Sequence, residues 1–355
     1  MRTFYEFFAG GGMARAGLGQ DWQCLFANDF DAKKAASYAE NWGDEDMIHQ
    51  DVANLTSDNL PGHADLAWAS FPCQDLSLAG AGAGLQGKRS GTFWSFWKLM
   101  LQLKEESRAP RMIVLENVSG ALTSHEGKDF SAICSALGSA GYQFGAVVAN
   151  AVDFVPQSRP RLFIIAVDSS IAINSIVTSN GPLMPWHPRT LKEACLKVPQ
   201  PHQSKWVWWN LPAPPHRQTA FSDLVEETPT GTRWHTEEET KKLLGMMSDL
   251  HLEKVKAAQH AGTKKVGTIY KRTRPDGKGG RIQRAEVRFD DVAGCLRTPA
   301  GGSSRQVIMV VERDSIRSRL LSTREAARLM GLPDTYKLPE KYNDAYRLAG
   351  DGVAV

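Results

Sequence analysis

Short apolar runs separated by glycines, prolines and polar turns recur along the first half of the chain. Residues 3–8 are rich in β-formers, and residues 64–69 and 112–115 are continuous apolar runs of the kind found in strands covered on both faces. Residues 93–105 and 130–140 have the spacing of amphipathic helices. This alternation predicts an α/β fold with a mostly parallel sheet and helices on both of its faces.

The pattern changes after residue 173. Eight prolines between Pro182 and Pro215 interrupt any long element, so we predict a second domain here. Within it, residues 236–260 have the pattern of one helix, with acidic residues first and lysines later. Residues 264–288 then carry nine lysines and arginines against Asp276 and Glu286 alone.

Composition narrows the class of protein. With 355 residues, 42% of them hydrophobic, the chain has enough apolar side chains for a large core, and two domains are favoured over one. The net charge of +3 is small, so nucleic acid would have to bind a local basic face. No apolar run of membrane-spanning length and no amino-terminal secretion signal are found, so we expect a cytoplasmic protein without membrane contact. Five widely spaced cysteines favour neither disulfides nor a metal site.

One of these cysteines, Cys73, follows a predicted strand directly. Pro72 has no N–H group and stops the strand, which places Cys73 on a loop at the strand's carboxyl end. Open α/β sheets bind their ligands at that edge. A lone cysteine is usually a small buried apolar residue. Here, however, Glu116 follows another apolar run, and Arg159 and Arg161 precede a further predicted strand.

Three short motifs follow one another in the chain. They are Phe71-Pro72-Cys73-Gln74, Glu116-Asn117-Val118 and Gln157-x-Arg159-x-Arg161. In this order they resemble the motif series of the DNA cytosine-5 methyltransferases, and the resemblance covers residues 4–168 and about 290–355. It implies a Rossmann-like S-adenosylmethionine-dependent methyltransferase sheet with one reversed strand near Leu162, plus a smaller mixed target-recognition domain. The implied domains are residues 1–173 (catalytic and cofactor-binding), 174–305 (target recognition) and 306–355 (return to the catalytic domain).

The resemblance also implies catalytic roles. Cys73 would add to carbon 6 of a cytosine flipped out of the duplex and so make carbon 5 nucleophilic. Glu116 would protonate or hydrogen bond ring nitrogen 3, Arg161 would hold the ring's carbonyl oxygen, and Arg159 would support the thiol and the backbone. The base that removes the carbon-5 proton is not assigned.

A glycine turn and a distant acid suggest a nucleotide cofactor. Residues 9–12 form the turn after the first predicted strand, and Asp29 follows about 20 residues later, a spacing that a nicotinamide enzyme would also show. Phe8-x-Gly10-x-Gly12 is similar to the S-adenosylmethionine loop of the methyltransferase family. Asp51 is a cofactor contact by this resemblance and a loop-capping carboxylate by its local sequence. The implied cofactor-binding residues are Phe8, Ala9, Gly10, Gly12, Met13, Asp29, Phe30, Asp51, Val52, Pro72, Asp351 and Val353. The family usually has Asn where this chain has Asp351.

The basic run at 264–288 predicts a DNA-facing surface, with a solvated charged face as the alternative. The glycine-rich stretch 79–91 is either a flexible surface connection or a loop that closes on DNA, as the resemblance favours. The predicted DNA-binding residues are Gln74, Ser77, Lys88, Arg89, Gln157, Arg272, Arg274, Arg281, Arg284, Ser303, Ser304 and Arg305.

Near the end of the chain, Ser322 and Glu325 have the spacing of a capping box, which predicts a helix that stops at Gly331. Taken together, these features predict a methyltransferase that acts on double-stranded DNA in bacterial or phage restriction-modification or self-marking. We expect a monomer, associated with the nucleoid, whose cognate restriction endonuclease acts separately. The alternatives are a tRNA cytosine-5 methyltransferase of the same family and a catalytically silent nucleic-acid-binding relative.

Overall fold

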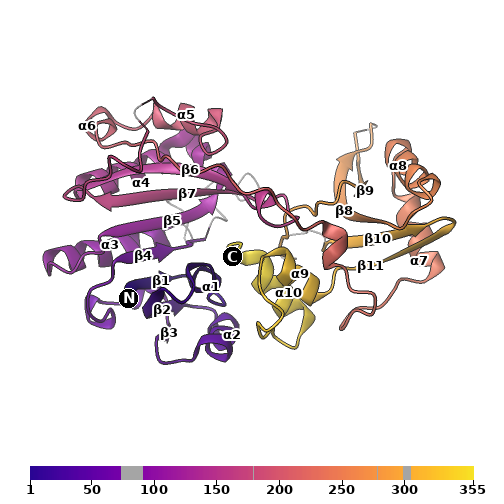
Figure 1. Cartoon of the computed structure of the whole chain (residues 1–355), viewed down its shortest axis with the longest axis horizontal. Coiled ribbons are helices and arrows are strands. Elements are labelled where there is room, and N and C mark those ends of the chain that lie inside the picture. The colour runs from indigo at the N-terminus through magenta and orange to yellow at the C-terminus, as the bar shows by residue number, and fades with distance from the viewer. Residues whose placement is uncertain (73–90, 179, 278, 299–304) are drawn as a thin grey trace. The chain divides into compact units, whose positions relative to one another are not determined.

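A computed structural model describes residues 1–72, 91–178, 180–277, 279–298 and 305–355 (Figure 1). The chain forms two compact units. The first comprises Met1–Asn150 and Pro160–Pro214, and the second comprises Ala151–Arg159 and Pro215–Val355. Within the described ranges, no helix combines the length and the apolar character needed to cross a membrane. Seven predicted site residues lie outside these ranges: Cys73, Gln74, Ser77, Lys88, Arg89, Ser303 and Ser304.

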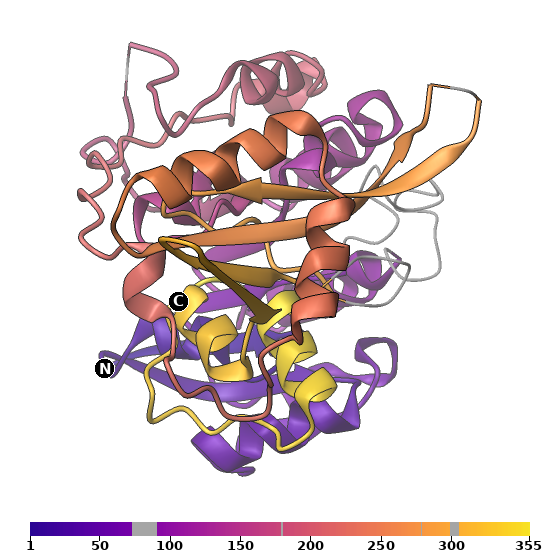
Figure 2. The ribbon, with the colours of Figure 1, turned by 90° about the vertical axis from the view of Figure 1, so that its right-hand side faces the viewer.

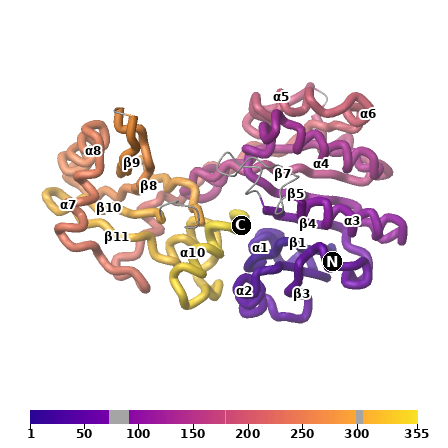
Figure 3. Tube along the Cα trace, turned by 180° about the vertical axis from the view of Figure 1, so that it is seen from behind, coloured from indigo at the N-terminus to yellow at the C-terminus, as the bar shows by residue number. Residues whose placement is uncertain are grey.

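The first unit is built on a seven-stranded sheet in the order β3-β2-β1-β4-β5-β7-β6. Its strands are β1 (Arg2–Phe7), β2 (Trp22–Asp29), β3 (Met47–His49), β4 (Leu66–Ala69), β5 (Met112–Val118), β6 (Tyr142–Asn150) and β7 (Pro160–Asp168). Strand β7 runs antiparallel to both β5 and β6, and the other pairs are parallel. Figure 3 shows β1, β4, β5 and β7 following one another across the sheet. The predicted α/β class, with one reversed strand at Leu162, is confirmed.

Helices cover both faces of this sheet. Phe96 of α3 and Phe130 of α4 belong to one buried cluster with Phe7 of the sheet. Tyr38 of α2 is buried with Phe4 in a separate cluster. The helices of this unit are α1 (Met13–Leu18), α2 (Ala32–Trp42), α3 (Thr92–Glu105), α4 (Lys128–Ser139), α5 (Arg189–Cys195) and α6 (Gln200–Gln203), with short 3-10 turns η1 (Val52–Asn54), η2 (Ser57–Asn59), η4 (Ser119–Leu122) and η5 (Ser124–Gly127).

The segment after β7 adds a short strand-like stretch to the outer edge of β6. Phe144 N–H donates to Lys205 O, and Val207 N–H donates to Phe144 O, at 2.9 and 2.8 Å. Gly145 makes this approach possible, because a β-carbon there would lie 2.1 Å from Val207 O. Residues 174–214 therefore pack with the first unit, whereas the predicted division begins the target-recognition domain at residue 174. The assignment of roles to the domains stays a prediction.

The second unit holds a four-stranded antiparallel sheet in the order β11-β10-β8-β9. Its strands are β8 (Lys265–Pro275), β9 (Arg281–Arg288), β10 (Val307–Glu312) and β11 (Ser315–Leu320). Its helices are α7 (Glu237–Gly245), α8 (Asp249–His260), α9 (Thr323–Leu329) and α10 (Tyr342–Asp351), with 3-10 turns η6 (Ala151–Asp153) and η7 (Phe221–Leu224). Leu243 of α7 and Val255 of α8 pack on apolar residues of the sheet such as Ile269 and Met309.

The prediction of one helix over residues 236–260 is wrong, because the structure has two. Helix α7 ends at Gly245, and Ser248 has the extended conformation (φ −79°, ψ 164°) of a residue that precedes a new helix. Glycine ends helices readily, and serine is favoured at a helix start. The predicted capping box is confirmed, since Glu325 N–H donates to Ser322 Oγ at 3.1 Å and Ser322 N–H donates to Glu325 Oε2 at 2.7 Å.

Candidate active site

Several strands of the first unit end at the same edge of its sheet. Phe7 of β1 pairs with Ala69 of β4, and Ala69 pairs with Leu115 of β5. At the end of β5, Val118 pairs with Arg161, which lies near the start of the reversed strand β7. The loop after Phe7, the chain leading into residue 73 and Arg161 therefore start from one sheet edge.

Glu116 lies inside β5, one residue beyond the expected strand end at Leu115. The antiparallel partner β7 extends the ladder, pairing Glu116 with Phe163. Because side chains on one face alternate, Glu116 and Arg161 point to the same side of the two strands. Arg161 Nε lies 3.2 Å from Glu116 Oε1, and the two side chains are 15% and 10% exposed. The structure thus brings two of the predicted catalytic residues together.

Asn117 connects β5 to the loop that leads into residue 73. Its side-chain Nδ2 donates to Phe71 O at 3.3 Å, and the side chain is buried. Phe71 is itself buried against Phe93. The contact holds the backbone that precedes Pro72 beside the end of β5. The sequence contains Asn117 within a motif, but its pattern gives no signal for this contact.

The glycine turn after β1 has a backbone that few side chains adopt. Phe8, Gly10 and Gly12 have φ values of 57°, 57° and 76°. Asp29, at the end of β2, accepts a hydrogen bond from Gly10 N–H at 2.9 Å. Burial raises the pKa of Asp29 above its ordinary value. Phe30 follows with 63% of its surface exposed, which leaves an open aromatic face beside the turn.

Further cofactor-binding candidates of the first unit either accept a backbone hydrogen bond or are buried. Asp51 accepts a hydrogen bond from Ala53 N–H at 2.9 Å and so caps the turn η1, the alternative that its local sequence offered. Val52, Ala9 and Met13 are buried. A cofactor contact from these residues stays a prediction.

Glu6 is a buried acid that sequence reasoning did not single out. It lies on β1, two residues before Phe8, and its Oε1 accepts a hydrogen bond from Arg15 N–H at 3.3 Å. Its Oε2 has no hydrogen bond within the described part of the chain. Burial raises the pKa of Glu6 to about 8. In the sequence, Glu6 stands between Tyr5 and Phe7 in a predicted strand, and this position could have indicated a buried acid.

In the second unit, Gln157 and Arg159 are buried and bonded to the backbone. Gln157 Nε2 donates to Leu329 O at 2.7 Å, and its Oε1 accepts from Leu296 N–H at 2.9 Å. Arg159 donates to Leu296 O at 3.2 Å, and to the carbonyl oxygens of residues 350 and 352 at 3.0 and 2.6 Å. These bonds give both side chains a bracing role in the unit. Their predicted roles toward DNA and the thiol stay predictions.

Asp351 and Arg305 also have partners inside the second unit. The Asp351 carboxylate accepts a hydrogen bond from Thr298 Oγ1 and pairs with Arg347 Nε at 3.5 Å. The Arg305 guanidinium lies over the ring of Tyr342, 5.5 Å from its centroid. Val353, a further predicted cofactor contact, is buried.

Comparison with known proteins gives the family. A family model described as C-5 cytosine-specific DNA methylase matches residues 2–355. The chain belongs to this family. Among curated relatives, it is 24% identical to the type II methyltransferase M.BsuFI of Bacillus subtilis, covering 99% of this chain and 69% of that protein. It is also 24% identical to the type II methyltransferase M.HhaI of Haemophilus parahaemolyticus, covering 99% and 90%.

Solved structures agree on the fold. The Dnmt2 methyltransferase of S. pombe superimposes with a TM-score of 0.62 at 15% identity, covering 100% of this chain and 95% of that one. A putative DNA modification methyltransferase encoded within an E. coli prophage gives a TM-score of 0.53 at 18% identity, covering 100% and 95%. The chain is therefore a DNA cytosine-5 methyltransferase by family, and its fold is the one predicted from the motifs.

The basic run of this methyltransferase forms the hairpin of β8 and β9. Arg272 lies directly opposite Arg284, and Pro275 lies opposite Arg281. Strand β10 pairs with β8 only from Lys265 to Ile269, so the rest of the hairpin extends beyond its sheet (Figures 1 and 2). The four predicted DNA-binding arginines Arg272, Arg274, Arg281 and Arg284 all lie on this extension.

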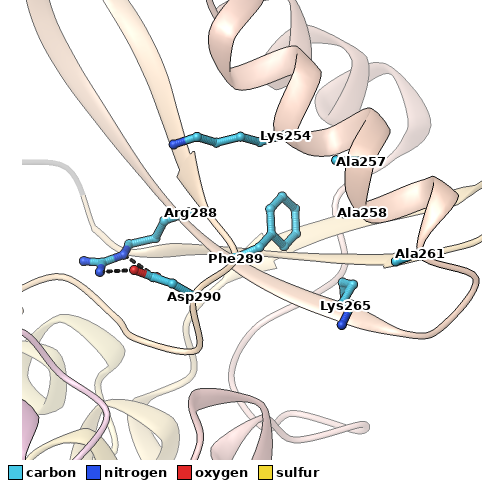
Figure 4. A pocket seen from close by; sticks show the side chains of 8 residues that line it. All are labelled: Lys254, Ala257, Ala258, Ala261, Lys265, Arg288, Phe289 and Asp290. Atoms are coloured by element: carbon cyan, nitrogen blue, oxygen red, sulfur yellow. Dashed lines mark hydrogen bonds and ion pairs between the residues drawn. The ribbon is translucent and has the colours of Figure 1, made fainter.

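A pocket of about 380 Å³ lies between α8 and the base of the same hairpin (Figure 4). Alanines of α8 and Phe289 give it an apolar lining. Lys254 and Lys265 lie around it, and Arg288 Nε donates to Asp290 at 2.6 Å. None of the predicted catalytic or cofactor-binding residues that the structure describes lines this pocket.

Proposed function

We propose that this methyltransferase transfers a methyl group from S-adenosylmethionine to carbon 5 of a cytosine in double-stranded DNA, through a covalent adduct with Cys73. The observation that carries the proposal is the Glu116–Arg161 pair, 3.2 Å apart, at the sheet edge where Phe71 and Pro72 lead into Cys73. A carboxyl and a guanidinium at one edge match the nitrogen and the carbonyl oxygen of one pyrimidine.

The chemistry requires a temporary change in the ring. The Cys73 thiolate adds to carbon 6, and a bond forms while the ring electrons move toward carbon 5. Glu116 protonates or hydrogen bonds nitrogen 3, and Arg161 holds the carbonyl oxygen, so both offset the charge that develops. After the methyl group is in place, loss of the carbon-5 proton returns its electron pair to the ring and expels the thiolate. The cytosine must first leave the stacked duplex to reach these groups.

The surroundings of the glycine turn support S-adenosylmethionine as the bound cofactor. A β-carbon at Gly10 would have no heavy atom within 4 Å, so the turn leaves open space beside its backbone. We expect Asp29, which already accepts a hydrogen bond from Gly10 N–H, to accept hydrogen bonds from ribose hydroxyls, and exposed Phe30 to pack against the adenine. When bound, S-adenosylmethionine would supply an electrophilic methyl group and leave as S-adenosylhomocysteine, whose sulfur keeps the electron pair of the broken carbon–sulfur bond.

A 5-fluorocytosine duplex tests the proposal directly. Bisulfite sequencing of DNA from cells that express the chain first identifies the methylated context. A duplex with 5-fluorocytosine at that position should then become covalently attached to the protein, because carbon 5 carries no proton to lose. The Cys73→Ser variant should form no adduct and lose methyl transfer by at least about 10⁴-fold.

Cys195→Ser is the matched control, since Cys195 is a half-buried thiol at the end of α5, and it should behave as the wild type. Transfer of tritiated methyl groups to tRNA instead of DNA would favour the tRNA alternative. DNA binding without any methylation would favour the silent relative. Restriction-modification as the biological setting, a separately acting endonuclease and a monomeric state rest on the sequence and remain part of the proposal.

A further inference from the structure

The extension of the β8–β9 hairpin is exposed on both faces. From Arg272 to Gln283 every described residue is exposed, with residue 278 outside the description. Beyond Ile269 the hairpin is a ribbon of two strands. A ribbon of this width is one of the elements that the major groove of DNA admits.

One face of this ribbon holds a fixed arrangement of charges. Tyr270, Arg272 and Arg274 share it with Glu286 and Arg284 of the opposite strand, because paired residues in an antiparallel ladder point the same way. Arg274 Nε lies 2.5 Å from Glu286 Oε1, and Arg272 Nε lies 3.5 Å from Glu286 Oε2. One carboxylate therefore holds two arginines.

Both arginines use the same atom toward Glu286. Nε faces the carboxylate, and the described residues provide no hydrogen bond to the terminal NH₂ groups of either side chain. Arg272 is further restrained by the ring of Tyr270, with its guanidinium 5.8 Å from the centroid. Half of each arginine side chain is exposed, while Glu286 is 22% exposed. The half-exposed side chains thus keep their terminal NH₂ groups for a ligand.

Attraction to phosphates alone does not require this arrangement. Glu286 reduces the charge of the three arginines on this face from +3 to +2, which weakens non-specific binding to DNA. What the carboxylate adds is orientation. An oriented arginine fork matches O6 and N7 of guanine, the commonest specific contact in the major groove.

We infer that Arg272 and Arg274 read guanines of the target sequence and that Glu286 is the positioning residue that aims them. The inference rests on DNA as the substrate in the proposed function. Residues two apart in a strand are about 7 Å apart, and successive base pairs are about 3.4 Å apart. The two arginines are therefore expected to read positions about two base pairs apart.

The test uses the full-length protein and a library of duplexes with randomised positions around a cytosine. Bisulfite sequencing of the methylated products gives the base preference at each position. Arg272→Lys and Arg274→Lys keep the positive charge but lose the fork. Each is expected to reduce the preference for guanine at one position by about 5- to 150-fold, at different positions for the two variants. The salt dependence of binding should stay unchanged, because the number of charges is the same.

Arg313→Lys is the matched control. Arg313 is an exposed arginine in the turn between β10 and β11, outside the ribbon, and the base preferences of this variant should match the wild type. Glu286→Gln should relax both guanine positions while non-specific binding stays equal or rises, because a negative charge is lost. Circular dichroism and thermal melting check that each exposed substitution leaves the fold intact.

The inference is overturned if both lysine variants keep every base preference within about twofold, or if Arg313→Lys relaxes the same positions. A wild-type chain that methylates no duplex would contradict the proposed function instead. In that case, duplexes that bind the protein are selected from the same library and sequenced. Guanine preferences that disappear in Arg272→Lys and Arg274→Lys would still support the inference.

Discussion

One glutamate–arginine ion pair in each unit is largely buried, and these two pairs differ in how many hydrogen bonds the glutamate accepts from the described residues. In the second unit, Glu325 accepts four hydrogen bonds, two from Arg319 and two from the backbone N–H groups of Ser322 and Glu226. Both side chains of this pair are 0% exposed. In the first unit, Glu116 pairs with Arg161 at a sheet edge, and both side chains keep some exposure.

This difference indicates that the Arg319–Glu325 pair stabilises the fold, whereas the Glu116–Arg161 pair can bind a ligand. A carboxylate with all its acceptor positions occupied can support neighbouring segments but has no capacity for a ligand. Among the described residues, the Glu116 carboxylate has one charged partner, so it retains acceptor positions for a substrate. The nitrogen–oxygen distance does not distinguish the two pairs, because both pairs are within hydrogen-bonding range. The number of hydrogen bonds that each glutamate already accepts does distinguish them.

Glu116→Gln gives the largest effect expected from a change in either of these two ion pairs. Glutamine keeps the shape and an oxygen for Arg161 but cannot donate the proton that nitrogen 3 requires. Methyl transfer to the identified DNA target should fall by about 10²- to 10⁴-fold, while thermal unfolding stays close to the wild type. Glu105→Gln, an exposed residue of α3, is the control and should keep full activity. Retained activity in Glu116→Gln would remove Glu116 from the reaction.

Arg319→Met should lower the free energy of unfolding and leave the methyl transfer of the folded protein unchanged. It leaves Glu325 buried without its charged partner, which costs about 3–5 kcal/mol of the free energy of unfolding. Methyl transfer by the folded fraction, measured below the unfolding transition, should persist. Urea unfolding followed by fluorescence measures the loss, and Arg313→Met, at an exposed arginine in the turn between β10 and β11, is the control. Combining Arg319→Met with Glu325→Gln should recover part of the loss, and a change below about 1 kcal/mol in the single variant would contradict the assignment.

Glu6 provides a smaller, pH-dependent test, because it is a buried acid to which the described residues offer no side-chain ion pair. Its pKa rises from 4.5 to about 8 on folding, so between these values the folded chain keeps a proton that the unfolded chain has lost. This contribution to stability is complete below pH 4.5 and is lost as the pH rises through about 8, with a slope of about 1.4 kcal/mol per pH unit.

Glu6→Gln removes this proton exchange. Its free energy of unfolding should therefore depend less steeply on pH between 5 and 8 than that of the wild type. Urea titrations at several pH values measure the difference, with the exposed Glu40→Gln as control. Identical slopes for Glu6→Gln and the wild type would show that Glu6 ionises normally in the folded chain.

The sequence predicts most of the first unit because its strands are continuous apolar runs with clear stops. Pro72 and the glycines at 10–12 mark the loops at the sheet edge, and the motif order identifies the family. The extension of β5 through Glu116 was not predictable, since it depends on pairing with β7, a strand more than 40 residues later.

The second unit was harder to predict. Its break at residues 246–248 lies within a stretch whose charges favour one continuous helix. The ion pairs of Glu286 with Arg272 and Arg274 depend on the register of strands β8 and β9. The number of charged residues in the sequence does not specify that register. Burial of Gln157 and Arg159 likewise results from contacts with residues about 140 to 190 positions away.

Gly145 has a consequence for self-association. Strand β6 is the last strand of its sheet, and an uncovered outer edge would offer its backbone groups to another chain. Residues 205 and 207 occupy those groups at Phe144, and they can approach because residue 145 has no side chain. A single methyl group at this position would push the covering segment away, and a second copy of the protein could then extend the sheet.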